Sequence, residues 1–202
     1  MAIAIPIKPQ HLWNIMNGIK KGEVRKNEAL INAIKKEIAE KGKATIYCIC
    51  SKSKPYIKQC EHFRVLDYTE IANEGYYLNG KVVCKFECKK VEDIKYTPYE
   101  CTYYTETLDT ILIGDKEPTL LKSSCLDYQE LADYLGREKE VVGAFIYISN
   151  LKIFDKAKDI SDLRFARAYN FGDMHNCRVS LTKAPQNFCY VEDTLWKDFS
   201  NI

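Results

Sequence analysis

Short hydrophobic runs, several of them alternating with polar residues, recur along the chain, and this pattern predicts more strands than helices. After the turn at Asn79-Gly80, for example, Val82, Cys84, Phe86 and Cys88 alternate with residues of the opposite face. We expect strands over the following stretches: Ala2–Ile7, Glu23–Lys26, Ala44–Cys50, Lys81–Val91, Tyr99–Thr107, Val141–Ser149 with its continuation Leu151–Phe154, Arg178–Thr182 and Phe188–Glu192.

Three stretches have helical spacing and recognisable ends. Gln10–Asn17 is closed by Gly18, and Glu28–Lys41 lies between a plausible N-cap at Asn27 and a stop at Gly42. Ser124–Leu135 is predicted as a capped helix that ends at Gly136. Residues 56–79 are mixed, and we expect loop with some helix there.

The order of these elements favours a mixed barrel of the α+β class over a doubly wound sheet, because strands and helices do not alternate regularly. The chain has 202 residues, of which 46% are hydrophobic and 29% charged, enough to bury a core without disulfides or metal. No apolar run is long enough to cross a membrane and no signal peptide is evident, so we expect a cytoplasmic protein without membrane contact.

Nine cysteines are present, none of them in a CxxC pair. In a cytoplasmic protein they are expected to be reduced thiols in core positions. Cys60 with His62 and His175 with Cys177 form CxH and HxC pairs that together offer four zinc ligands. The spacing matches no known zinc module, so we expect neither a metal nor another cofactor.

Charge is distributed unevenly. Residues 1–60 contain twelve Lys and Arg against four Asp and Glu, whereas residues 92–140 contain five against twelve. A basic N-terminal part predicts one positive face, and positive faces attract phosphates. The alternative is that lysines such as Lys35 and Lys36 form only the solvated side of a helix.

The segment Gly18-Ile-Lys20-Lys-Gly-Glu23-Val-Arg25 fits the pattern G-x-K-x-x-E-x-R. With this motif the chain resembles the ASCH domain family, a branch of the PUA-like β-barrel superfamily. The surrounding order of strand, short helix, motif, helix and strand is similar as well, and the resemblance covers residues 2–155. The segment from Ala184 to Glu192 looks like a tail seen in phage-type members, and bacterial or phage relatives are implied.

The resemblance implies a PUA-like mixed β-barrel over residues 1–155, with two early helices flanking it. Residues 92–140 would be an enlarged, helical and acidic insertion, and residues 156–202 an extension packing on the barrel. The implied function is recognition of RNA or a modified nucleotide in a basic cleft around the motif.

Some ASCH domains are hydrolases of RNA or of N4-acylated cytidine, which makes a small metal-independent hydrolase the alternative function. The enzymes that act on acylated cytidine use a lysine, matched here by Lys20, with a threonine and a glutamate. Glu23 takes the place of that threonine, and a carboxylate is a poor substitute for a hydroxyl nucleophile. A third alternative is a protein-interaction module that uses residues 92–140.

In an extended segment Lys21, Glu23 and Arg25 would share one face and Lys20 the other. Glu23 and Arg25 then either form a neutralising pair that anchors the strand, or Glu23 orients Arg25 toward a phosphate or a base. Lys20 would bind a phosphate or act as a base, with Glu23 as its proton shuttle.

Further candidate ligand contacts lie at the ends of two predicted strands. Lys8 follows the first, and Ser51 and Lys52 follow another, although each of them fits a solvated surface equally well. An exposed tyrosine near the basic face would favour single-stranded nucleic acid, because bases stack on aromatic rings. Tyr47, Tyr56 and Tyr147 are the candidates, with core packing as the alternative for Tyr47 and Tyr147.

Overall fold

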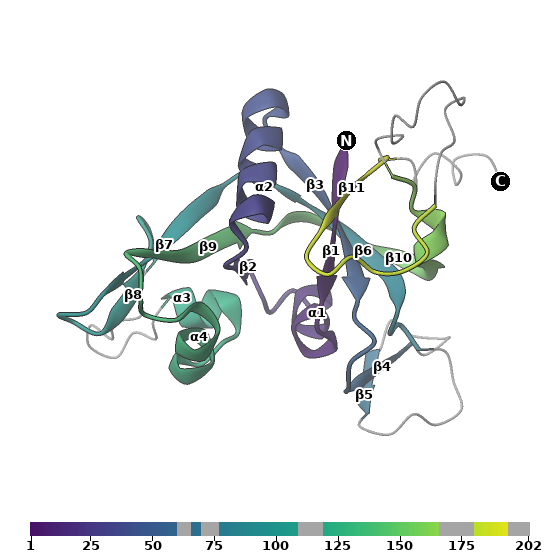
Figure 1. Cartoon of the computed structure of the whole chain (residues 1–202). Helices are drawn as coiled ribbons and strands as arrows, with labels where there is room; N and C mark the ends of the chain where they lie inside the picture. Colours follow the sequence, from purple (N-terminus) through teal and green to yellow (C-terminus); the bar gives the residue numbers. More distant parts are fainter. Residues whose placement is uncertain (60–65, 70–76, 109–118, 166–179, 194–202) are drawn as a thin grey trace. The chain divides into compact units, whose positions relative to one another are not determined.

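The computed structural model describes residues 1–59, 66–69, 77–108, 119–165 and 180–193 (Figure 1). It has a mixed α+β architecture in which the β structure includes a curled half-barrel sheet. Residue contacts divide the chain into two compact units. Unit 1 comprises Met1–Trp13, Thr45–Glu87 and Asn150–Ile202, and unit 2 comprises Asn14–Ala44 and Cys88–Ser149.

Unit 1 is built on a five-stranded sheet with the order β10-β6-β3-β1-β11. Its strands are β1 (Ala2–Ile7), β3 (Ala44–Cys50), β6 (Lys81–Cys88), β10 (Ser149–Asp159) and β11 (Cys189–Val191). The parallel partners β1 and β3 consist almost wholly of buried residues, as hydrophobic central strands require. A short 3₁₀ helix follows β10 at Ile160–Asp162, and a separate hairpin pairs β4 (Tyr56–Gln59) with β5 (Leu66–Thr69).

The core of unit 1 joins the sheet to the C-terminal part of the chain. Tyr47, Phe154 and Val191 are among its buried members. Strand β11 pairs antiparallel with β1, with Ile3 opposite Tyr190. The Tyr47 hydroxyl donates to Asp193 at 2.6 Å, and Lys85 Nζ donates to the same carboxylate at 3.1 Å. Residues 189–193 are therefore held to the sheet by backbone, polar and apolar contacts.

Unit 2 contains a four-stranded sheet with the order β2-β9-β7-β8. The strands are β2 (Gly22–Arg25), β7 (Val91–Thr97), β8 (Thr102–Tyr104) and β9 (Val141–Tyr147), all antiparallel to their neighbours. Helices α3 (Thr119–Ser124) and α4 (Tyr128–Leu135) contribute to its core, in which Leu131 and Leu135 pack with Phe145. Helix α2 (Glu28–Lys41) contacts β7, where Lys35 forms an ion pair with Asp93 at 2.7 Å.

Several predicted elements are confirmed residue by residue. The first strand, the strand at 44–50 and the helix at 28–41 have the expected bounds, and Asn27 caps the helix by accepting from the Leu30 N–H. Gly42 ends the helix in the left-handed conformation that favours glycine. The helix predicted over 10–17 is α1 (Pro9–Met16).

Several predictions about local structure are wrong. In the stretch 99–107 only Thr102–Tyr104 is a strand. Of the strand expected over 178–182, residues 178 and 179 lie outside the described residues, and Ser180 forms only an isolated bridge. Residues 56–59 and 66–69 form strands, where loop with some helix was expected, because their pairing with each other outweighs a weak local pattern. The helix expected over 124–135 is shorter, because α4 begins only after its N-cap Asp127, and Ser124 is the last residue of a separate helix, α3, that was not predicted. Cys125, with a φ of 52°, breaks the helical path between them.

Gly22 packs beneath an aromatic ring. A Cβ atom at this position would lie 2.0 Å from Cζ of Phe145, which sits on the neighbouring strand β9. We expect Gly22→Ala to lower the free energy of unfolding by about 1–3 kcal/mol through overpacking. Urea unfolding should also show that Gly22→Ala combined with Phe145→Leu is less destabilised than the sum of the two single variants. Strictly additive losses would contradict this account.

Candidate functional site

The motif residues 18–25 form a tight turn followed by an edge strand. Helix α1 ends at Met16, and Gly18, with a φ of 69°, turns the chain. The carbonyl of Asn14 accepts hydrogen bonds from the N–H groups of Ile19 and Lys20. The extended conformation begins only at Gly22, where β2 pairs with β9. The turn therefore fixes the position of Lys20 before the strand starts.

Three charged motif side chains meet at this point. Lys20 Nζ lies 3.1 Å from Oε2 of Glu23, and Nε of Arg25 lies 3.0 Å from Oε1 of the same carboxylate. The side chains are 2%, 6% and 15% exposed for Lys20, Glu23 and Arg25. Two cations thus share one buried anion, so the three groups carry a formal charge of +1.

The sequence prediction placed Glu23 and Arg25 on one face, which the structure confirms, and Lys20 on the opposite face, which is wrong. The alternation rule applies only to extended chain, and residues 18–21 are a turn. The turn brings the Lys20 ammonium back to Glu23. Lys21, predicted beside Glu23, is exposed, and its ammonium donates to the Gly18 carbonyl at 2.6 Å.

The ends of α3 and α4 border the motif. The Lys21 N–H donates to the Ser123 carbonyl at 2.8 Å, and the Lys21 carbonyl accepts from the Ile148 N–H at 3.0 Å. Cys125 lies within electrostatic reach of Lys20 and Lys21, but burial dominates and raises the pKa of its thiol. A protonated thiol is a weak nucleophile, so Cys125 adds no obvious chemistry to the motif.

Apart from Tyr147, which is in unit 2, the remaining candidate ligand contacts from the sequence lie in unit 1. Lys8, Ser51 and Lys52 come together at one end of the β1–β3 pair, where the Ser51 N–H donates to the Ile7 carbonyl at 2.9 Å. Lys8 and Lys52 are exposed. Tyr47 is fully buried and hydrogen-bonded to Asp193, so its ring offers no face to a ligand. Tyr56 packs against Tyr77 with the rings tilted by 59° and their centroids 5.5 Å apart.

A second polar cluster, in unit 2, surrounds the buried carboxylate of Glu92. The Thr107 hydroxyl lies 2.9 Å from both carboxylate oxygens and 2.8 Å from the Tyr147 hydroxyl, and Lys90 forms an ion pair with Glu92. Burial by itself would raise the pKa of Glu92, but hydrogen bonds from Lys90, Thr105 and Thr107 lower it to about 2. Glu92 therefore stays ionised near neutral pH and is a poor base.

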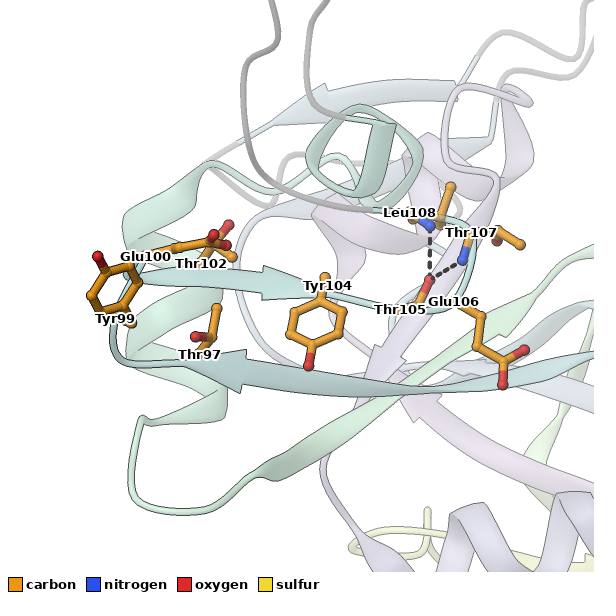
Figure 2. A pocket seen from close by; sticks show the side chains of 9 residues that line it. All are labelled: Thr97, Tyr99, Glu100, Thr102, Tyr104, Thr105, Glu106, Thr107 and Leu108. Atoms are coloured by element: carbon orange, nitrogen blue, oxygen red, sulfur yellow. Dashed lines mark hydrogen bonds between the residues drawn. The ribbon is translucent and has the colours of Figure 1, made fainter.

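This cluster borders two cavities beside β7 and β8. The larger, of about 450 Å³, is lined by four threonines, two tyrosines, two glutamates and Leu108 (Figure 2). The Thr105 hydroxyl shapes its wall by accepting from the N–H groups of Thr107 and Leu108 at 3.2 and 2.9 Å (Figure 2). The smaller cavity, of about 290 Å³, includes Lys90, Glu92 and Glu106.

The larger cavity is unsuited to a phosphate. Its two glutamates, Glu100 and Glu106, are exposed, and no Lys, Arg or His is among its described lining residues. A phosphate there would meet like charges among the described lining residues, whereas the Lys20, Glu23 and Arg25 side chains together carry a formal charge of +1. The motif is therefore the better candidate for binding an anion.

Four of the described cysteines, Cys48, Cys50, Cys84 and Cys88, are buried as expected, whereas the expectation of a core position is wrong for the exposed Cys101. In the described part of the chain all seven are free thiols, and burial raises the pKa of Cys50 to about 12 and those of Cys88 and Cys189 to about 11. Within the same residues no three His, Cys, Asp or Glu side chains gather as metal ligands would. Cys60, His62, His175 and Cys177, the possible zinc ligands, lie outside the described residues.

Among the helices of the described residues, none combines the length and apolar character needed to cross a lipid bilayer. Comparisons of the chain with protein-family models, with curated proteins and with solved structures find no match.

The shared carboxylate predicts an order of stability among charge variants. Glu23→Gln removes the anion between two buried cations and should lower the free energy of unfolding by about 3–5 kcal/mol. Lys20→Met leaves Glu23 and Arg25 as a neutral pair and should lower the free energy of unfolding clearly less than Glu23→Gln does. Urea unfolding of both variants tests this, and equal losses would show that Lys20 and Arg25 do not depend on a common counter-ion.

The lowered pKa of Glu92 predicts that this residue stabilises the folded protein only above acid pH. Its pKa in the folded protein, about 2, lies below the ordinary value of 4.5, so the ionised carboxylate stabilises the fold fully above pH 4.5. This contribution, at most about 3 kcal/mol, should be lost as the pH falls from 4.5 toward 2. The free energy of unfolding, measured from pH 4.5 to 2, should fall less steeply for Glu92→Gln than for the wild type.

Asp93→Asn is the matched control for Glu92→Gln, because the Asp93 side chain is 42% exposed and lies next to Glu92 in the same strand. Its ion pair with Lys35 is largely exposed, so Asp93→Asn should change the acid dependence of stability less than Glu92→Gln does. An unchanged acid dependence in Glu92→Gln would contradict the assignment.

Proposed function

We propose that this chain is an ASCH-type, PUA-like domain that recognises RNA or a modified nucleotide at the Lys20–Glu23–Arg25 site. The observation that carries the proposal is the pair of buried cations that share one carboxylate, 3.1 and 3.0 Å away. The α+β architecture with a half-barrel sheet agrees with such a domain at the level of fold class.

The electrostatics of the site favour a phosphate. A formal charge of +1 in a mostly desolvated place attracts an anion more strongly than the same charge on an open surface, because the effective dielectric constant is lower. Arg25 retains 15% exposure of its side chain, and its planar guanidinium suits a phosphate or the edge of a base. Glu23 then serves as the group that holds both cations in place.

Hydrolysis of RNA or of an N-acylated cytidine is the second candidate function. The 3.1 Å separation of Lys20 Nζ and Glu23 Oε2 favours it, because proton transfer between two groups requires such a contact. In this function Lys20 acts as base or electrostatic catalyst and Glu23 as the proton shuttle. The absence of a hydroxyl at position 23 weighs against the nucleophilic mechanism of the acylcytidine hydrolases.

The test is a fluorescence anisotropy titration with a labelled mixed-sequence single-stranded RNA at low salt. We expect the wild type to bind with an affinity that falls steeply as salt is added, and Lys20→Ala to weaken binding and reduce the logarithmic salt slope by about 0.7. Lys36→Ala is the matched control. It removes the same charge from the same unit, but from a side chain that is 62% exposed.

Analysis of the RNA after the titration separates the two functions. Intact RNA with Lys20-dependent binding supports recognition, whereas Lys20-dependent fragments, or release of the acyl group from N4-acetylcytidine, support hydrolysis. Equal weakening by Lys20→Ala and Lys36→Ala would overturn the assignment of the site. Failure of the folded wild type to bind or cleave RNA and to hydrolyse N4-acetylcytidine would overturn the proposed function.

A further inference from the structure

An aromatic ring lies next to the cationic end of β2. Tyr134, in the last turn of α4, has Nζ of Lys26 over its ring, 5.2 Å from the centroid. Lys26 directly follows Arg25, the last residue of β2. One aromatic residue and two cations are therefore gathered where the motif ends.

Backbone contacts fix the position of this ring. Burial raises the pKa of the Tyr134 hydroxyl, and the nearby Lys26 backbone opposes this rise. A Cβ placed on Gly143 would lie 2.7 Å from both the Arg25 carbonyl oxygen and a methyl carbon of Leu135, the neighbour of Tyr134. The end of α4 and the end of β2 thus meet across Gly143, and Tyr134 is held in one place beside Arg25.

Tyr134 is also accessible, unlike the core tyrosines of unit 2. It is 36% exposed, whereas Tyr103 is fully buried in the core and Tyr96 nearly so. Tyr99, at the turn between β7 and β8, is 96% exposed. Among these four residues, Tyr134 combines an accessible ring with a defined orientation and with neighbouring cations.

We propose that Tyr134 is a stacking platform for a nucleobase whose phosphate is bound by Arg25 and Lys26. The inference rests on the proposed function and makes it more specific: the ligand is a nucleotide in single-stranded RNA, because a base paired within a duplex cannot lie on the ring. Stacking on an aromatic face tolerates any base, so affinity gained here is independent of sequence. A ring already held by Lys26 loses little conformational freedom when a base stacks on it.

The test compares the affinity for RNA with the affinity for an oligonucleotide that has the same backbone but no bases. Wild-type protein is titrated with a short single-stranded RNA and with an abasic oligonucleotide of equal length and charge. A single stacked base should tighten binding of the RNA by about 5- to 150-fold. Tyr134→Leu should remove this advantage and leave binding of the abasic oligonucleotide unchanged, whereas Tyr134→Phe should retain it. Tyr99→Leu, the matched control, should bind both ligands as the wild type does.

A second measurement keeps the inference testable if Tyr134→Leu fails to fold. An RNA with 2-aminopurine in place of one base should lose fluorescence on binding to the wild type, because stacking on the ring quenches this base. As a control, an excess of the abasic oligonucleotide, which displaces the labelled RNA, should restore part of the fluorescence. Unchanged fluorescence in the bound state would overturn the stacking.

The outcomes distinguish the inference from the function on which it rests. Lys20-dependent binding of RNA with no loss in Tyr134→Leu would overturn the platform and leave the proposed function intact. Equal weakening of RNA and abasic binding by Tyr134→Leu would show that Tyr134 only supports the cations. Failure of the wild type to bind either ligand would overturn both.

Discussion

The candidate site depends on one physical constraint, the requirement that two cations buried in a protein find a common counter-ion. Glu23 meets it for Lys20 and Arg25, and much of the local structure serves to bring these groups together. The turn at Gly18 returns Lys20 to the strand, and the pairing of β2 with β9 aligns Glu23 with Arg25. Because burying an unpaired charge costs several kcal/mol, no member of this arrangement is independent of the others.

Much of the local structure follows from the sequence because its signals are themselves local. Asn27 and Gly42 mark both ends of α2, and the alternation in residues 82–88 predicts the buried face of β6, although Val83 on the other face is buried as well. The errors arise where a contact with a residue outside the local segment determines the local structure. Strands β4 and β5 form by pairing with each other, and Cys125 adopts a positive φ within the stretch that was expected to begin a helix.

The motif could be found in the sequence, but its geometry could not. Alternation along a strand correctly placed Glu23 beside Arg25 and failed for Lys20, because nothing in the pattern shows that extended chain begins at Gly22. Glu92 and Tyr134 were missed for another reason. Their partners, Thr107 for Glu92 and Lys26 for Tyr134, become neighbours only through the register of the sheet and the docking of α4. A buried acid among hydroxyl groups carries no sequence signature.

Gly22 also ties the site to the hydrophobic core. Because the Phe145 ring occupies the space of its missing side chain, β2 can pair with β9 in one register only, and that register sets the positions of the charges. Separation of β2 from β9 would uncover Phe145 and disperse Lys20, Glu23 and Arg25 in the same event. Local unfolding and loss of the charged site are therefore one cooperative transition, and amide hydrogen exchange in β2 reports on the integrity of both.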